Sequence, residues 1–322
     1  MFRTAFAAGL VGFTALAFAV SAPQPAAADT DFIRIATAGS GGNYYRLGGG
    51  LAAIYNDVLD GSQASIQATG GSVENLDLLA DQEVEVAYLT GSVGQQAFTN
   101  TGRFQDRPQG RYDGLRAIAT VYPNPQWFIA IDDDITSLRD LEGKRVSVGT
   151  QGGAGENWWR SIMDHLGWTY ADIKPEFTVH QAAIDQVRNR QIDAIIWPDA
   201  PGSASIQQVA DTGFGRVLDL DADVIERMTT DSLDYAYTVP ASANPFGETP
   251  IQTFASPITF ATHSGMSDDM VYALVKAMFE NKERLIGVHP LAEYMTLENA
   301  TSGLPFPLHP GAERFYREMG VL

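Results

Sequence analysis

The stretch "IRIATAGSGGNYYRLGGGLAAIYND", residues 33–57, sets a pattern that recurs along this 322-residue chain. Alternating apolar residues predict a β-strand over residues 33–37, the glycine cluster at 39–42 predicts a tight turn, and helical spacing begins near Asn43. Such a junction presents unpaired backbone N–H groups and the positive end of a helix dipole, which suit a carboxylate or a phosphate. The glycines would permit close approach of a ligand or a positive φ, although they could equally form only a tight turn.

The same order of strand, glycines and helix returns twice. It is found in "SIQATGGSVENL" (residues 65–76) and in "RVSVGTQGGAGEN" (residues 145–157), and another helix start follows Thr90. Because the carboxyl ends of parallel strands meet at one edge of a sheet, we expect these turns to lie near one another and to bind a ligand there. The spacing excludes two nucleotide-binding motifs, since Tyr44 stands where the dinucleotide fingerprint needs its third glycine and no Gly-Lys-Ser/Thr follows.

The first 28 residues have the pattern of a cleavable secretory signal peptide. One arginine precedes an uncharged apolar run over residues 5–20, and three alanines at 26–28 end the segment. We therefore expect cleavage after Ala28 and a periplasmic location. No later segment is long and apolar enough to span a bilayer, so the sequence predicts a soluble protein without stable membrane insertion.

Composition narrows the class of partner. The net charge of −18 argues against nucleic acid and anionic membranes, because both require basic patches that neutralise phosphates. The chain has no cysteine, which rules out disulfides and thiolate metal sites. A hydrophobic fraction of 45% is that of a protein with a packed core. The charge favours solubility but says little about the ligand itself.

Two proline-bearing segments divide the chain. Strand-like residues at 115–131 contain Pro123 and Pro125, and those at 237–262 contain Pro240, Pro245, Pro250 and Pro257. Central strands of parallel sheets do not tolerate internal prolines, so we interpret both segments as crossings between two lobes. Elsewhere strands alternate with helices, including a helix near residues 182–190, which predicts an α/β fold with a doubly wound, mostly parallel sheet in each lobe. The predicted division is a signal peptide at 1–28, a first lobe at 29–122 and 245–322, and a second lobe at 123–244, with a ligand cleft between the lobes and hinges at the crossings.

Catalytic and metal-binding patterns are not evident. The five histidines show no metal-ligand spacing, no G-x-S-x-G nucleophile elbow occurs, and the acidic run at residues 132–134 lacks the calcium-loop spacing. The sequence thus predicts a binding protein rather than an enzyme, with no catalytic residue, no metal and no cofactor.

Five motifs together resemble the solute-binding proteins of TAXI-type TRAP transporters, a branch of the periplasmic binding proteins. They are "AGSGGNYYRLGGGLA" (38–52), "TGGSVENLDLL" (69–79), "LEGKRVSVG" (141–149), "MSDDMVYALVKAMFEN" (266–281) and "PLHPGAERFYREMG" (307–320). The resemblance implies a type II-like two-lobe periplasmic-binding-protein fold and capture of a small carboxylate-bearing solute such as glutamate, glutamine, a dicarboxylate or a 2-oxo acid. It also implies a monomer that delivers the solute to TRAP permease subunits driven by an ion gradient.

The same resemblance places the binding loops at residues 40–45 and 71–75. In the second lobe the chain departs from it, because the family commonly has Gly-Ser-Gly-Thr-Glu where residues 152–156 read Gly-Gly-Ala-Gly-Glu, and two hydroxyls are lost. Thr90 and Ser92 also stand where relatives often carry Gln and Asp. These departures argue against glutamate itself as the ligand.

Side chains near the glycine loops complete the candidate site. Tyr44 is favoured over Tyr45 as the ring that faces the ligand, and Arg46 could pair with a carboxylate or remain solvated. Trp158 and Trp159 lie about 100° apart on a helix, so one of them is expected to line the cleft. The candidate ligand-binding residues are Ser40, Gly41, Gly42, Asn43, Tyr44, Gly71, Ser72, Val73, Thr90, Gln151, Gly152, Gly153, Ala154, Gly155, Trp158, Trp197 and Asp199.

Two other functions fit the same pattern of elements. One is an exported α/β enzyme of hydrolase type that uses Glu156, Asp199 or a histidine as a base. The other is a ligand-sensing subunit that passes its bound state to a signalling receptor. Turnover would identify the enzyme, and a neighbouring permease or histidine kinase gene would separate transport from sensing.

Overall fold

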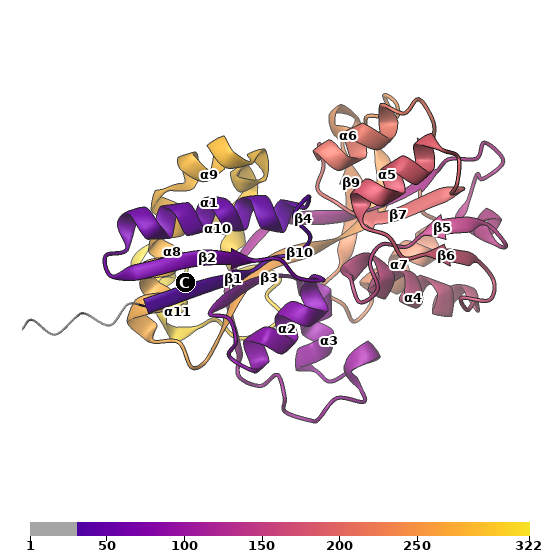
Figure 1. The fold of residues 1–322 in the computed structure, drawn as a ribbon. Coiled ribbons are helices and arrows are strands. Elements are labelled where there is room, and N and C mark those ends of the chain that lie inside the picture. Colours follow the sequence, from indigo (N-terminus) through magenta and orange to yellow (C-terminus); the bar gives the residue numbers. More distant parts are fainter. Residues whose placement is uncertain (1–30) are drawn as a thin grey trace, which may run out of the picture.

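The computed structural model describes residues 31–322, so the predicted signal peptide lies outside the described residues. The chain forms two α/β lobes joined by two long strands, β4 and β10, as Figure 1 shows. The strands are β1 (Asp31–Ala36), β2 (Ser62–Gln67), β3 (Val86–Thr90), β4 (Leu115–Ala130), β5 (Arg145–Ser147), β6 (Lys174–Glu176), β7 (Ala194–Pro198), β8 (Arg216–Val217), β9 (Tyr235–Val239) and β10 (Ile251–His263).

The α-helices are α1 (Asn43–Val58), α2 (Ser72–Ala80), α3 (Gly91–Phe98), α4 (Ala154–Leu166), α5 (His180–Arg188), α6 (Ala204–Ala210), α7 (Ala222–Thr229), α8 (Asp268–Glu280), α9 (Lys282–Val288), α10 (Leu297–Ala300) and α11 (Pro310–Glu318). Short 3₁₀ turns are η1 (Gly102–Phe104), η2 (Leu138–Leu141), η3 (Ala241–Ala243) and η4 (Pro290–Tyr294). Within residues 31–322, no helix combines the length and the apolar character needed to cross a bilayer.

One continuous path of paired strands runs through both lobes. Its order is β2-β1-β3-β10-β4-β7-β5-β6, with β8 paired to β4 and β9 paired to β10. The pairs β1 with β2, β1 with β3, β5 with β6 and β5 with β7 are parallel, whereas every pair that involves β4 or β10 is antiparallel. The two-lobe α/β fold with two crossings is therefore confirmed, and the sheet is mixed because the crossing strands run against their neighbours.

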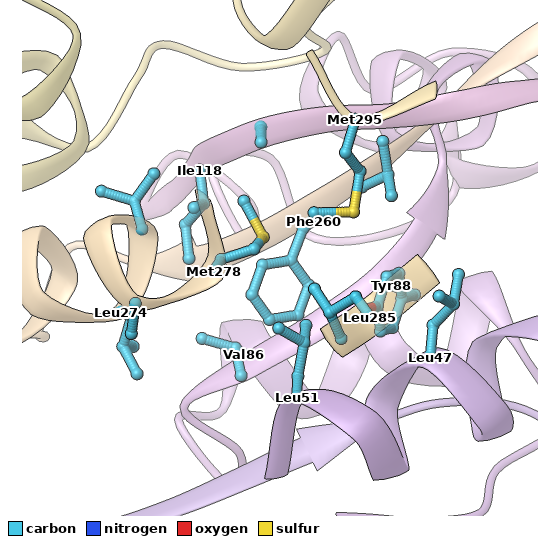
Figure 2. Packing of buried hydrophobic residues seen from close by; sticks show 14 of the residues in the cluster. Leu47, Leu51, Val86, Tyr88, Ile118, Phe260, Leu274, Met278, Leu285 and Met295 are labelled. Carbon is cyan, nitrogen blue, oxygen red and sulfur yellow. The ribbon is translucent and has the colours of Figure 1, made fainter. Parts of the chain in front are cut away.

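The first lobe has an apolar cluster on each face of its sheet. On one face, Leu47 and Leu51 of α1 pack with Phe260 of β10 and with Leu274 and Met278 of α8 (Figure 2). On the other face, residues of α2 and α3 pack under β3, including Leu76, Leu79 and Val93. Burial of apolar surface contributes about 25 cal/mol of stability per Å². Burial on both faces of the sheet therefore fixes the junction of β1, its loop and α1 in place.

The second lobe repeats this arrangement with different helices. One cluster joins Trp158 and Trp159 of α4 to Val146, Ile196 and Phe254 of the sheet. The cluster on the opposite face joins residues of α5 and α6 to β7 and β9, including Ile184, Ile206, Trp197 and Val239.

Three of the six prolines, Pro123, Pro125 and Pro257, lie inside the crossing strands β4 and β10. The other three, Pro240, Pro245 and Pro250, lie between β9 and β10, so the second crossing strand begins at Ile251 and not at residue 237. Pro123 pairs with Pro257 and Pro125 with Ala255, and the register shifts between Pro257 and Thr259. Beyond Pro125 the strand takes β7 as a new partner, beginning at Gln126. The missing N–H groups thus lie where β4 exchanges partners, which is why an antiparallel strand of 16 residues accommodates two prolines. The division of the chain at 122/123 and 244/245 stays a prediction.

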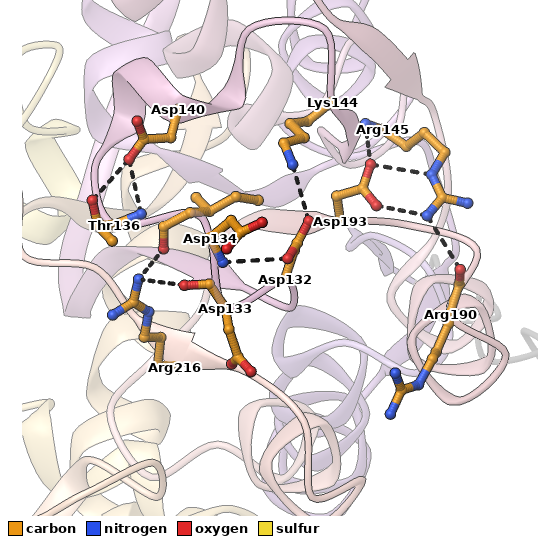
Figure 3. A network of polar contacts seen from close by, with 11 residues as sticks. Asp132, Asp133, Asp134, Thr136, Asp140, Lys144, Arg145, Arg190, Asp193 and Arg216 are labelled. Atoms are coloured by element: carbon orange, nitrogen blue, oxygen red, sulfur yellow. Dashed lines mark hydrogen bonds and ion pairs between the residues drawn. The ribbon is translucent and has the colours of Figure 1, made fainter.

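The acidic run at residues 132–134 contacts basic groups of its own lobe, as Figure 3 shows. Asp132 accepts a hydrogen bond from Lys144 at 2.9 Å, and Arg216 donates to the carbonyl oxygen of Asp133 at 3.4 Å. Among the described residues, no group of three His, Asp or Glu side chains is placed to hold a metal ion.

Candidate functional site

Two adjoining cavities of about 260 and 440 Å³ lie between the lobes. Both are lined by residues at the carboxyl ends of strands and at the helix starts that follow them. The residues that line both cavities are Ala38, Gly41, Gly42, Gly70, Thr150, Gly153, His180, Gln181 and Pro198. We refer to the two cavities together as the cleft.

Five helices without a side-chain cap begin at the cleft, three from the first lobe and two from the second. The residues before α1, α2, α3, α4 and α5 are Gly42, Gly71, Thr90, Gly153 and Val179, and none of these supplies a side-chain cap to its helix in the described chain. The first turns of these helices therefore present backbone N–H groups and positive dipole ends toward the cleft. An anion is the ligand that this arrangement stabilises.

The first lobe lines the cleft with polar groups that lie beside stacked aromatic rings. The ring of Tyr44 stacks on Tyr88 with a centroid separation of 5.4 Å, and its hydroxyl lies 3.3 Å from Oγ1 of Thr90. Ser72 donates to the same Thr90 oxygen at 3.3 Å. Burial raises the pKa of Tyr44 to about 12, so its phenol stays neutral and can donate to a ligand oxygen.

A hydrogen bond spans the cleft between the lobes. Nδ2 of Asn43, at the start of α1, donates to Oδ1 of Asp199 at 2.7 Å. The backbone N–H of Ala200 donates to the same carboxylate oxygen at 2.8 Å, and the hydroxyl of Ser205 donates to the other oxygen. The Asp199 residue is only 3% exposed, so this contact holds a buried carboxyl group beside the helix N-termini of the cleft.

Two histidines line the same cleft. The ring of His180 lies 4.2 Å from the ring of Trp197, centroid to centroid. Burial lowers the pKa of His180, and the charge of Asp199 opposes that shift only in part. Burial and the nearby Arg46 lower the pKa of His289. Both imidazoles are therefore neutral near pH 7, and Arg46 is the permanently cationic side chain in the lining.

The structure brings twelve of the predicted residues to the cleft. The smaller cavity is lined by Gly41, Gly42, Asn43, Tyr44, Gly71, Ser72, Thr90, Gly153 and Asp199. The larger cavity adds Ser40, Gly155 and Trp197. Arg46, which the sequence left between a ligand contact and a solvated role, is exposed at the cleft.

Three of the predicted residues, Val73, Gln151 and Gly152, do not line the cleft. Val73 packs on the apolar cluster under β3, and Gln151 is exposed. Gly152 donates its backbone N–H to Glu156 at 3.0 Å. Ala154 is the first residue of α4, and its contact with a ligand stays a prediction. The sequence is enough to predict that a glycine loop is present. Which of its residues face a ligand depends on how the loop packs in the folded protein.

The expectation that one tryptophan of α4 lines the cleft was wrong. Trp158 and Trp159 are 1% and 0% exposed. The helix is covered on two sides, since Trp158 packs edge-on against Phe254 and Trp159 against Trp168. Two positions 100° apart can both be core when a helix contacts more than one neighbour.

Of the two reasons offered for glycine in the first loop, close approach of a ligand or a positive φ, the second does not apply to Gly41 and Gly42. The glycines with φ in the left-handed region include Gly71, Gly149 and Gly152, but neither Gly41 nor Gly42. A Cβ atom built on Gly41 would meet no atom within 4 Å. Room for a ligand is therefore the remaining reason for a glycine at position 41.

Sequence reasoning missed several lining residues. Tyr122 and Asn124 flank Pro123 in β4 and project from the crossing itself, and Asn124 is 6% exposed. His180 and Gln181 begin α5, whose start the sequence placed two residues later. The rule that ligands bind at the carboxyl ends of strands could have found His180 and Gln181, which follow β6. It does not indicate Tyr122 and Asn124, which lie in the middle of β4.

A second polar contact joins the lobes beside the cleft. Nη1 of Arg103, which follows α3 in the first lobe, lies 3.2 Å from Oε2 of Glu156 in α4. Glu156 also accepts from the N–H of Gly152 at 3.0 Å, from Tyr170 at 3.0 Å and from Arg160. Burial raises the pKa of this carboxyl, but the hydrogen bonds from Gly152, Arg160 and Tyr170 outweigh it and leave the pKa lowered. Glu156 is thus an ionised group already satisfied by the protein.

Comparison with known proteins gives a family and a fold. The model of the NMT1-like family matches residues 35–320. A protein from Bordetella bronchiseptica RB50 has 13% identity and a TM-score of 0.55, over 91% of this chain and 99% of that one. A putative L-cystine ABC transporter from Listeria monocytogenes has 12% identity and a TM-score of 0.51, over 84% and 99%.

A third similar structure is an ancestral arginine-binding protein bound to arginine. It has 15% identity and a TM-score of 0.50, over 83% of this chain and all (100%) of that one. At these identities the similarity concerns the fold, which is the two-lobe fold of periplasmic binding proteins.

Proposed function

The chain belongs to the NMT1-like family, and from that membership and its two-lobe fold we propose that it is an extracytoplasmic solute-binding receptor. The observation that carries the proposal is the convergence of helix N-termini without a side-chain cap on one cleft, three from the first lobe and two from the second. A solute that contacts helix ends of both lobes would stabilise the closed arrangement of the lobes, which is how such a receptor signals that it is loaded.

We further propose that the solute carries a carboxylate. Backbone N–H groups at helix starts, the phenol of Tyr44 and the guanidinium of Arg46 all favour an anionic oxygen. Asp199 lies in the same cleft and would repel a second anionic group, so a ligand with both a carboxylate and a hydrogen-bond donor suits it better than a dianion. An amino acid fits this requirement, and a dicarboxylate or 2-oxo acid is the comparison ligand.

Isothermal titration tests the ligand class. The panel comprises amino acids, dicarboxylates and 2-oxo acids, with sugars and amines as controls. A micromolar affinity for one acid, about −8 kcal/mol, is expected. Arg46→Gln should weaken it about tenfold through loss of a charge-assisted contact, whereas Arg188→Gln, on the exposed surface of α5, should leave it unchanged. Failure of every acid to bind a folded protein would overturn the carboxylate proposal.

The partner proposed for the loaded receptor is the permease of a TAXI-type TRAP transporter. Uptake of the identified solute by cells that lack this chain, with and without a plasmid copy, tests transport directly. A neighbouring histidine kinase gene together with unchanged uptake would favour the sensing alternative.

The enzyme alternative has a separate test. Its candidate base Glu156 is fully buried and holds four partners, which leaves no free oxygen for a substrate proton. Recovery of the bound solute unchanged after prolonged incubation, as judged by mass spectrometry, is the expected result. A released product would favour the hydrolase.

A further inference from the structure

A separate cavity of about 340 Å³ lies beside the crossing strands and is walled by both lobes. Leu233, Tyr235 and Tyr237 come from β9 and the residues before it, which pack with the second lobe. Tyr294 and Asn299 come from η4 and α10, and Figure 1 shows α10 in the first lobe and β9 in the second. The remaining lining residues are Thr120, Val121, Tyr122, Pro123, Pro257, Ser302 and Gly303.

Four tyrosine rings line this cavity, and two of them are set as adjacent walls. The rings of Tyr235 and Tyr237 are 6.2 Å apart, centroid to centroid, with an angle of 78° between their planes. Tyr294 and Tyr122 contribute the other two rings. Tyr235 and Tyr294 are 40% and 37% exposed, so aromatic surface that a globular protein would normally cover remains accessible.

The lining of the cavity is uncharged. None of the residues that line it carries a charge, and among the described residues no helix of eight residues or more begins there. Asp234, which is 5% exposed, directly precedes Tyr235. Burial raises the pKa of Tyr235 to about 12, with further contributions from Tyr237, Asp234 and Tyr294, so the phenol of Tyr235 is neutral at physiological pH.

We propose that this cavity is a second binding site, specific for an organic cation with an alkylated ammonium group. Perpendicular aromatic walls place negative ring faces on two sides of such a group, which is the arrangement by which proteins recognise quaternary ammonium ions. The protein's net charge of −18 favours a cation further, while an anion would find neither a cationic side chain nor a long helix end in the lining. The site differs in its chemistry from the cleft, and the inference does not depend on the proposed function.

Two probes of the same shape, one charged and one neutral, distinguish recognition of the charge from recognition of the shape. Choline and its uncharged isostere 3,3-dimethylbutan-1-ol are titrated into the full chain at constant ionic strength, with heat and tyrosine fluorescence as readouts. Choline is expected to saturate and the isostere to bind at least about tenfold more weakly, because the isostere lacks the cation–π attraction. Equal binding of the two probes, or no saturable binding of choline, would overturn the proposal.

Variants at one ring separate the aromatic face from the hydroxyl. Tyr237→Phe keeps the ring and should hold the choline affinity within about threefold, whereas Tyr237→Leu should weaken it about tenfold. Equal losses in both variants would assign recognition to the hydroxyl, and thus to a neutral hydrogen-bonding ligand, which contradicts the cation. Melting temperatures confirm that both variants fold, and Arg46→Gln, which alters the cleft alone, should leave choline binding unchanged.

Discussion

The glycine loops before α1 and α4 share one order of strand, glycines and helix, yet they differ in the space around their glycines. A Cβ built on Gly41 meets nothing within 4 Å, and one built on Gly42 meets only the carbonyl oxygen of Gly39 at 3.3 Å. In the second loop a Cβ on Gly153 would lie 2.7 Å from Oγ1 of Thr150, and one on Gly155 would lie 2.9 Å from Cδ of Pro198. The first loop is open to the cleft, and the second is packed.

The N-termini of α1 and α4, which follow these two loops, also differ in whether a side chain of the protein already occupies them. The start of α1 has no acidic residue in its first turn, whereas α4 carries Glu156 there, and its carboxylate accepts the N–H of Gly152. One anion already occupies the second helix end, so a ligand carboxylate should bind mainly at the first. Two loops that look alike in sequence can therefore have different roles, one in binding and one in holding the lobes together.

The largest expected effect is a loss of stability when the packed second loop and its helix α4 are altered. Glu156→Gln removes the charge that faces Arg103 and Arg160, and the free energy of unfolding should fall by about 2 to 3 kcal/mol, a value reduced from that of a fully buried pair because both arginines are partly exposed. Urea denaturation measures it. Glu280→Gln, in an exposed pair with Lys276, is the control and should cost less than about 0.5 kcal/mol. Similar losses in both variants would mean that Glu156 has no special role.

Acidification should reduce the difference between wild type and Glu156→Gln. Burial raises the pKa of Glu156, but hydrogen bonds from Gly152, Arg160 and Tyr170 lower it overall. A carboxyl whose pKa is lowered on folding contributes stability above its unfolded pKa and loses it as the pH falls through the folded pKa. The two denaturation curves should therefore converge in acid. A difference that stays constant through that range would contradict the ionised state of Glu156.

Adding one methyl group to either loop should change the stability of the protein by a different amount in each case. Gly153→Ala forces contact with the side chain and carbonyl of Thr150 and should destabilise the fold by about 2 kcal/mol. Gly41→Ala places the same methyl in open space and should change stability by less than about 0.5 kcal/mol. Equal thermal shifts in the two variants would remove the distinction between an open and a packed loop.

The affinity for the ligand should respond in the opposite way to the stability, with a clear loss in Gly41→Ala. With stability unchanged, Gly41→Ala should weaken the acid identified by titration about tenfold, because the methyl projects into the space that the ligand enters. Calorimetry on the folded variant measures this. Wild-type affinity in Gly41→Ala would show that the ligand does not approach this loop.

The smallest effect is expected at the neighbouring hydroxyl. Ser40 is exposed and lines the larger cavity, and Ser40→Ala removes at most one neutral hydrogen bond to the ligand, on the order of 1 kcal/mol. Affinity should fall less than in Gly41→Ala. A greater loss at Ser40 would mean that the side chain, and not the open backbone, is the main contact.

Local pattern was enough to predict the junctions and the crossings. The strand, turn and helix around Asn43 follow from alternation and glycine placement, and Ser267 caps α8 by accepting from the N–H of Met270, as a serine at that position favours. Pro123 and Pro125 indicated the crossing because their missing N–H groups restrict where a strand can carry them.

Long-range contacts could not be predicted in the same way. Arg103 and Glu156 are 53 residues apart, and no spacing in the sequence connects them. The burial of Trp158 likewise depends on Phe254 and on the hydrogen bonds of its indole N–H to Asp234 and Ser92, which come from other elements. The roles of individual loop residues follow from such contacts, which form only when the whole chain is folded.

The crossing between the lobes is a ribbon of two hydrogen-bonded antiparallel strands, β4 and β10, rather than a pair of loose tethers. Ladder hydrogen bonds resist stretching and sliding, and the register shift near Pro257 is where the ribbon can bend and twist. The lobes are thus expected to move along an arc about one axis and not to separate freely. On such an arc the gap between the lobes increases with distance from the axis, so a solute's position along the cleft, as well as its size, would set the angle at which the lobes come to rest.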